Sequence, residues 1–220
     1  MYRVGDKFFR FMNGGTSFQK GAPYLDGWNP YWRAYWTTEK GPHSWMAGTF
    51  GMQANLFPNS ASPHGPSNHF NDIGVDAQYQ YLASKNKLTG RASYIYEYQH
   101  WYGSYPLGAV SNLKGNLKTL DLSASLARDG WTFSGAYLLT NGANNAASFG
   151  VTDANGNLLS AKPNTTGYVI EVDRSLTQNV MLMAKYSGFT KVNGLTSNID
   201  GMGRKPSNNN TLWLNLFFAF

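Results

Sequence analysis

The chain has 220 residues, of which 42% are hydrophobic, 15% aromatic and only 14% charged, and its formal net charge is +6. No apolar run approaches the roughly 20 residues that a spanning helix needs, so a bundle of membrane helices is excluded. The absence of cysteine excludes a disulfide scaffold, a zinc-thiolate site and covalent c-type haem. The scattered Lys and Arg residues argue against nucleic acid as a partner.

Alternation of apolar and polar residues predicts strands along most of the chain. Residues 1–30 are predicted to be irregular, with a partial first strand at residues 2–11. Residues 31–220 contain nine predicted strands, at residues 31–38, 45–57, 70–82, 88–102, 117–126, 131–139, 168–174, 179–189 and 211–220. We therefore predict a single all-β domain over residues 1–220.

Short turns and long polar loops alternate strictly between these strands. Outer-membrane barrels show the same alternation, because their short turns lie on the periplasmic side and their long loops face outward. The fold class predicted is an antiparallel up-and-down transmembrane β-barrel of about ten strands, or part of a larger one. The longest loops, residues 141–166 and 194–210, are candidates for folding inward. The alternative is a soluble β-protein with one wet face, but no helix is predicted that could cover the other face.

Each predicted strand has an apolar and a polar side. The side expected to face lipid is formed by residues such as Trp32, Trp36, Met46, Phe50, Met52, Leu56, Ile73, Val75, Tyr94, Leu122, Phe133 and Tyr137. Seven aromatic residues near strand ends are predicted to form girdles at the headgroup level: Tyr31, Trp45, Tyr81, Trp101, Tyr102, Trp131 and Tyr168. The charged residues of the polar side are candidates for lining a water-filled lumen: Arg33, Asp72, Asp76, Arg91, Glu97, Asp121, Glu171, Asp173 and Lys185.

A symmetric hairpin over residues 70–102 predicts the cross-strand pairs. It places Gln80 opposite Arg91, Asp72 opposite Gln99 and Gly74 opposite Glu97. Acidic residues outnumber basic ones six to three among the lumen candidates. This excess predicts a mild preference for cations. The charges could instead pair with one another and plug a narrow barrel.

The last strand, with apolar residues at alternate positions and a closing Phe220, resembles the C-terminal signature of Gram-negative outer-membrane barrels. This resemblance implies outer-membrane location and gives Phe220 the role of a signal read by the barrel-assembly machinery. Residues 43–52 and 70–81 resemble the barrel part of proteobacterial porins, some of which are similar to cytochrome–porin fusions. Those fusions carry an N-terminal haem motif, which this chain lacks. Residues 1–7 also lack the pattern of a secretory signal, so we expect that numbering begins after processing or that the chain is the back part of a longer one.

These observations predict a porin for passive diffusion of small hydrophilic solutes or ions, in contact with outer-membrane lipid and lipopolysaccharide. The alternative function is a structural sleeve, or a docking partner for a periplasmic redox protein such as a cytochrome. We predict no enzyme, because no nucleophile elbow or phosphate-binding loop is present. We also predict no cofactor, and no metal site, because no carboxylate or Cys completes a ligand set at a recognisable spacing. His64, His69 and His100 could approach one another and bind a metal, but a role as loop and girdle residues is favoured.

Overall fold

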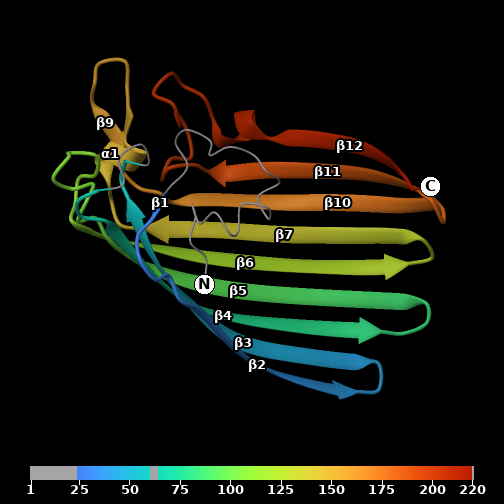
Figure 1. Cartoon of the computed structure of the whole chain (residues 1–220). Helices are drawn as coiled ribbons and strands as arrows, with labels where there is room; N and C mark the ends of the chain where they lie inside the picture. Colours follow the sequence, from blue (N-terminus) through green and yellow to red (C-terminus); the bar gives the residue numbers. More distant parts are fainter. Residues whose placement is uncertain (1–23, 60–63, 220) are drawn as a thin grey trace.

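The structure is a computed structural model that describes residues 24–59 and 64–219 (Figure 1). The described chain is almost entirely β-structure, with one turn of α-helix, α1 (Ala146–Phe149), and one 3-10 turn, η2 (Pro206–Asn209). No helix in this described part is long and apolar enough to cross a membrane. The predicted partial strand at residues 2–11 and the proposed assembly signal Phe220 lie outside the described residues.

All nine strands predicted between residues 31 and 220 are present, with ends shifted by a few residues. They are β2 (Tyr31–Lys40), β3 (His43–Phe57), β4 (Asn68–Leu82), β5 (Asn86–His100), β6 (Lys114–Arg128), β7 (Trp131–Gly142), β10 (Thr165–Thr177), β11 (Val180–Lys191) and β12 (Thr211–Phe218). Three short strands were not predicted: β1 (Tyr24–Leu25), β8 (Val151–Thr152) and β9 (Leu158–Ser160).

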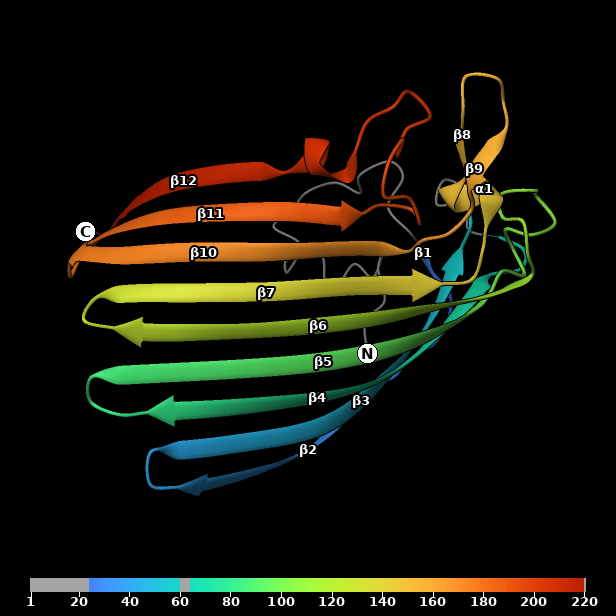
Figure 2. The same cartoon turned by 180° about the vertical axis from the view of Figure 1, so that it is seen from behind.

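The long strands form one antiparallel up-and-down sheet in which each strand pairs with its neighbours in sequence, except that β7 pairs with β10 across the separate β8–β9 pair. Figures 1 and 2 show this sheet as a single curved layer, with β2 and β12 at its two borders. Among the described residues β2 pairs only with β3, and β12 only with β11. The predicted antiparallel up-and-down fold is therefore confirmed, whereas its closure into a barrel stays a prediction.

The predicted alternation of short and long connections is also present. The short turns, at residues 41–42, 83–85, 129–130 and 178–179, lie at one end of the sheet, and the long connections lie at the other (Figure 1). Asp129 and Gly130 both have positive φ, 50° and 78°. Two left-handed residues in a two-residue loop match the right-handed twist of the flanking strands, which explains why Asp-Gly joins β6 to β7.

The register assigns every strand residue to a face, because directly opposed residues of neighbouring strands point to the same side. The predicted faces agree with the structure on β2, β4 to β7 and β10 to β12, but the assignment on β3 was wrong. Phe50 lies opposite Arg33, and Met46 lies opposite Gln78, so both share the polar face. The odd-numbered residues of β3, with Trp45, lie on the apolar face. The sequence of β3 does not show which of its alternate residues face the polar side, because glycines and apolar residues occur on both sides of the strand. Only its pairing with β2 and β4 decides this.

Candidate functional site

The polar face of the sheet carries all nine predicted charged residues. They come from six strands: Arg33 (β2), Asp72 and Asp76 (β4), Arg91 and Glu97 (β5), Asp121 (β6), Glu171 and Asp173 (β10), and Lys185 (β11). This face is the more enclosed of the two. From Leu122 to Arg128, polar-face residues are half-buried and apolar-face residues are exposed, in strict alternation. A sheet that curves around its polar side has this pattern of exposure.

An ion pair crosses β3 at one border of this face. The Arg33 guanidinium contacts the Asp76 carboxylate, although β3 lies between their strands. Gly48 makes the crossing possible, because a Cβ there would lie 2.6 Å from Oδ1 of Asp76. The guanidinium also lies 5.6 Å from the centre of the Phe50 ring, within the range of a cation–π contact. Both charges are identifiable from the alternation in the sequence, whereas the roles of Gly48 and Phe50 depend on the register.

A hollow of about 360 Å³ occupies the middle of the polar face. Small side chains form its floor, and Arg91, Glu171 and Lys185 lie around it. Lys185 Nζ is 3.5 Å from Glu171 Oε2, and Arg91 Nε donates to Gln78 Oε1 at 2.9 Å. A second hollow of about 250 Å³ lies beside the first, and Arg91 and Ser123 line both. Asp121 also lines the second hollow. The floor residues of the first hollow are Ser123, Ser125, Ser134 and Ala136.

The β4–β5 register differs from the symmetric hairpin by two residues. Arg91 lies opposite Gln78, Asp72 opposite Glu97, and Gly74 opposite Ile95. The prediction was wrong because a register with Gln80 opposite Arg91 leaves residues 84–87 as the turn. In the structure Leu82 pairs with Lys87, and only residues 83–85 remain between the strands. Two carboxylates therefore face each other near the loop end, and Gln99 Nε2 donates to Glu97 Oε1.

The Phe50 ring lies directly over Gly74, where a Cβ would overlap the ring atoms. We expect Gly74→Ala to destabilise the folded chain by about 1–3 kcal/mol, since the ring must leave its place. Urea unfolding in detergent micelles measures the change. Gly90→Ala is the matched control, because a Cβ at Gly90 meets no atom within 4 Å. Equal unfolding midpoints for the two variants would contradict the packing seen here, and adding Phe50→Ala should remove most of the cost of Gly74→Ala.

The opposite face carries apolar side chains that no other layer covers in the described structure. Substantial contacts between elements join neighbouring strands, β8 with β9, and η2 with β11. Ile73 is 56% exposed, Ile170 55% and Leu214 70%. Contiguous exposed apolar patches of this extent mark interaction sites or membrane contact.

Aromatic clusters centred on histidines lie at both ends of this apolar face. At the turn end, His43 Nδ1 is 2.8 Å from the Tyr79 hydroxyl, and its ring stacks with Trp45. At the loop end, His100 stacks on Tyr102, and His69 lies opposite His100. Tyr79 and His69 are ten residues apart on β4. A tilted strand of that length covers about 25 Å along a bilayer normal, the height of the apolar band of outer-membrane barrels.

The structure shows on which face the residues of the predicted girdles lie, whereas their place at the headgroup level stays a prediction. Trp45, Tyr81, Trp131 and Tyr168 lie on the apolar face. Tyr31 lies opposite Met52 on the polar face, and Trp101 packs against Phe70 on that same side. The side of Tyr31 and Trp101 follows from their contacts, because sequence alternation no longer fixes the side at strand ends.

The loop end of the sheet is held together by hydrogen bonds. Buried Asn68 donates to Ser104 Oγ, and its Oδ1 accepts from the backbone N–H groups of Gly103 and Ser104. Asn145 caps α1 and also accepts from Ser111 N–H. None of these loop residues lines the two hollows, whose described walls come from strands alone. The inward folding predicted for the longest loops therefore stays a prediction.

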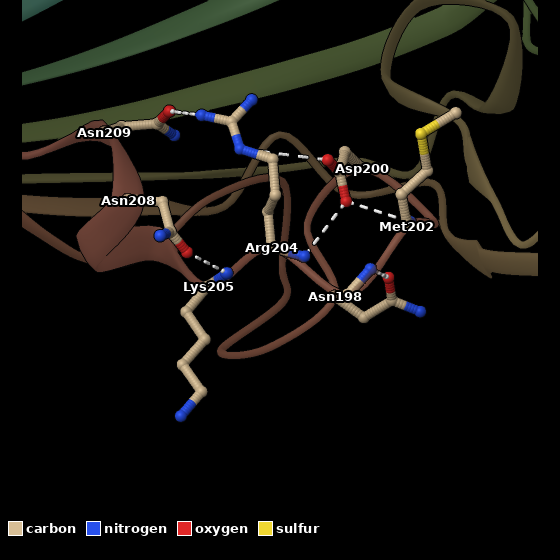
Figure 3. Close-up of polar contacts among 8 residues, drawn as sticks. Asn198, Asp200, Met202, Arg204, Lys205, Asn208 and Asn209 are labelled. Carbon is tan, nitrogen blue, oxygen red and sulfur yellow. Dashed lines mark hydrogen bonds and ion pairs between the residues drawn. The ribbon is translucent and has the colours of Figure 1, made fainter.

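Figure 3 shows how Asp200 organises the connection between β11 and β12. Its Oδ1 accepts from the backbone N–H groups of Met202, at 2.9 Å, and Arg204, at 3.2 Å. These hydrogen bonds, first the one from Met202, lower the pKa of the Asp200 carboxyl below its ordinary value. Asp153 likewise accepts hydrogen bonds in the β8–β9 turn, and those from Asn157 lower the pKa of its carboxyl. Both carboxylates fix loops outside the sheet.

Acidification is expected to loosen the Asp200 loop. A carboxyl whose folded-state pKa is depressed stabilises the fold above its unfolded pKa of about 3.9, and this contribution is lost as the pH falls through the lower folded value. Hydrogen-exchange protection at Met202 and Arg204 should therefore fall below about pH 4. Asp200→Asn should lower this protection already at neutral pH and reduce its response to acid. Asp153→Asn is the control and should leave these two amides unchanged; an identical pH response in Asp200→Asn would contradict the assignment.

The histidines considered for metal binding are only partly brought together, by the pairing of His69 with His100. No group of three or more His, Cys, Asp or Glu side chains among residues 24–59 and 64–219 is arranged to hold a metal ion. His64 is exposed in the connection before β4. The His69 and His100 rings both pack against Tyr102, and His100 Nε2 lies 3.4 Å from the Tyr98 hydroxyl.

Comparison of the chain with protein-family models found no match. The same holds for the comparisons with curated proteins and with solved structures. The resemblance to outer-membrane barrels and porins therefore stays a prediction, and function must be inferred from the two faces of the sheet.

Proposed function

We propose that the chain forms all or part of a β-barrel in a bacterial outer membrane, where it acts as a channel for passive diffusion of small hydrophilic solutes or ions. The observation that carries the proposal is the contrast between the two faces. The apolar face is exposed and ends in aromatic clusters, whereas the more enclosed face carries nine charged residues. Lipid solvates the first kind of surface and water the second.

The proposal requires that the borders of the sheet be paired in the membrane. Backbone N–H and C=O groups left without partners in hydrocarbon cost several kcal/mol each, so only closed sheets span bilayers. β2 and β12 are the strands whose outer edges need a partner. Both carry large exposed residues on the apolar face, such as Trp36 on β2 and Leu214 on β12, as suits strands inside a membrane wall.

Solute passage would depend on the polar face. The hollows beside Arg91 are floored by Ser and Ala side chains, which leave room for water and small solutes. The ion pairs Arg33–Asp76 and Glu171–Lys185 hold charged groups against the wall. Loops at the outer end would narrow the entrance without lining the strand region. Selection would then follow size and charge.

The test is ion conductance of the full chain refolded from detergent into planar bilayers. We expect stepwise conductance and heat-modifiable migration on SDS gels, as a membrane barrel gives. Stable insertion without conductance would contradict the channel and favour the sleeve or docking function. A monomer that stays in solution without detergent and does not insert would contradict the membrane proposal itself.

A further inference from the structure

Two arginines flank a tryptophan at the short-turn end of the apolar face. Arg128 on β6 lies opposite Trp131 on β7, and Trp131 lies opposite Arg174 on β10. The three residues thus form one row across three neighbouring strands. Next to this row, one position toward the middle of the same face, lie Leu126, Phe133 and Val172. Two positive charges are therefore placed at the border of an exposed apolar surface.

The side chains converge on the turn between β6 and β7. The Arg174 guanidinium lies 4.9 Å from the centre of a Trp131 ring, and its Nη1 donates to the Asp129 carbonyl oxygen at 2.7 Å. Arg128 Nε donates to the Asp129 carboxylate at 3.2 Å. A guanidinium has five N–H donors, and these hydrogen bonds use one on each arginine. Both groups are held in place and keep donors for a further acceptor.

The chemistry of this row fits a phosphodiester. Arginine's planar fork binds phosphate oxygens with paired hydrogen bonds, and tryptophan favours the headgroup level of a bilayer. With Asp129 included, two positive charges and one negative charge leave the cluster at +1. Phe133 stacks against Trp131 at 6.1 Å and is 51% exposed, so an apolar surface for an acyl chain begins directly beside the guanidinium groups.

We propose that Arg128, Trp131 and Arg174 bind the phosphate of an anionic phospholipid in the leaflet that faces the short turns. This inference rests on the proposed membrane function, because only a bilayer brings headgroups to that level. A soluble phosphate would use the two guanidinium groups but gain nothing from Phe133 and Leu126. The lipid source is therefore favoured over free phosphate.

The test is native mass spectrometry of the full chain in detergent, titrated with phosphatidylglycerol or phosphatidylcholine. The parent chain should prefer phosphatidylglycerol, and the double variant Arg128→Gln/Arg174→Gln should weaken its binding by about tenfold or more. The control Lys40→Gln/Lys85→Gln removes the same charge at the end of β2 and in the β4–β5 turn, both at the short-turn end, and should keep the preference. Arg174→Lys, which keeps the charge but not the fork, should give an intermediate loss.

Several outcomes would overturn the site. One is an unchanged preference in the double arginine variant; another is an equal loss in the lysine control, which would mean diffuse attraction by the whole rim. Competition by millimolar inorganic phosphate as effective as that by phosphatidylglycerol would assign the site to free phosphate. Insertion into phosphatidylcholine vesicles is measured first for every variant. A chain that fails to insert there contradicts the proposed membrane function, whereas an inserted chain without lipid preference contradicts only this site.

Discussion

Leu122→Arg is expected to abolish insertion of the chain into lipid vesicles, whereas Ser123→Arg is expected to insert. Leu122 lies near the middle of β6 on the apolar face and is 40% exposed. An arginine at mid-bilayer on the lipid side costs about 2–4 kcal/mol, so the equilibrium constant for insertion should fall by roughly 30-fold to 1000-fold. Heat-modifiable migration on SDS gels and protease protection in vesicles measure insertion.

Ser123→Arg provides the matched control, since the same side chain is placed one residue away on the polar face. It should insert and lower conductance, because Ser123 lies on the floor of both hollows. If the two variants inserted equally well, the apolar face would not contact hydrocarbon. If only Ser123→Arg failed, the assignment of the two faces would be reversed.

Reversing two acidic charges on the polar face should reverse the ion preference of the channel. The nine charged residues of that face comprise six acids and three bases, a formal charge of −3. Asp121→Lys and Glu97→Lys each change it by +2, so the double variant carries +1. Reversal potentials in a salt gradient should show cation preference for the parent chain and a shift to anion preference for the variant.

Asp26→Lys with Asp153→Lys is the control for this second prediction, because it makes the same change of charge in two connections outside the strands. Its effect on reversal potential should be smaller and should fade at high salt, where exposed charges are screened. An anion preference in the parent chain would contradict the prediction from the acidic excess. An unchanged reversal potential in Asp121→Lys/Glu97→Lys would show that these carboxylates do not face the permeating ions.

The sequence predicted the strands and most of their faces because a half-exposed strand has a two-residue period that survives without any tertiary information. On β6, the apolar face is clear from the sequence, because Leu120, Leu122 and Leu126 occupy alternate positions and Ser123 lies between them. On β3, glycines and apolar residues on both sides remove the signal, and the side is set by hydrogen bonds to β2 and β4. Register in the β4–β5 hairpin depended in the same way on the number of residues in the turn.

The candidate site was predictable as a set of residue types but not as a set of contacts. The two-residue alternation of side chains along each strand is enough to predict that Arg33 and Asp76 lie on the same face. Their ion pair depends on Gly48, which lies between them on another strand. The row formed by Arg128, Trp131 and Arg174 likewise joins residues up to 46 positions apart. No local sequence pattern predicts that these residues lie together. The packed loops were missed because Asn68 and Asn145 act through hydrogen bonds to distant backbone groups.

The exposed border strand β12 determines how the protein can be produced and purified. It borders the sheet, and large apolar side chains on both of its faces are exposed, with Leu212 at 66% and Trp213 at 57%. A long, flat, hydrophobic border strand recruits further chains in water through its free backbone groups. Production without a membrane or detergent should therefore yield inclusion bodies, and recovery of active material should begin from denaturant with amphiphile added before dilution.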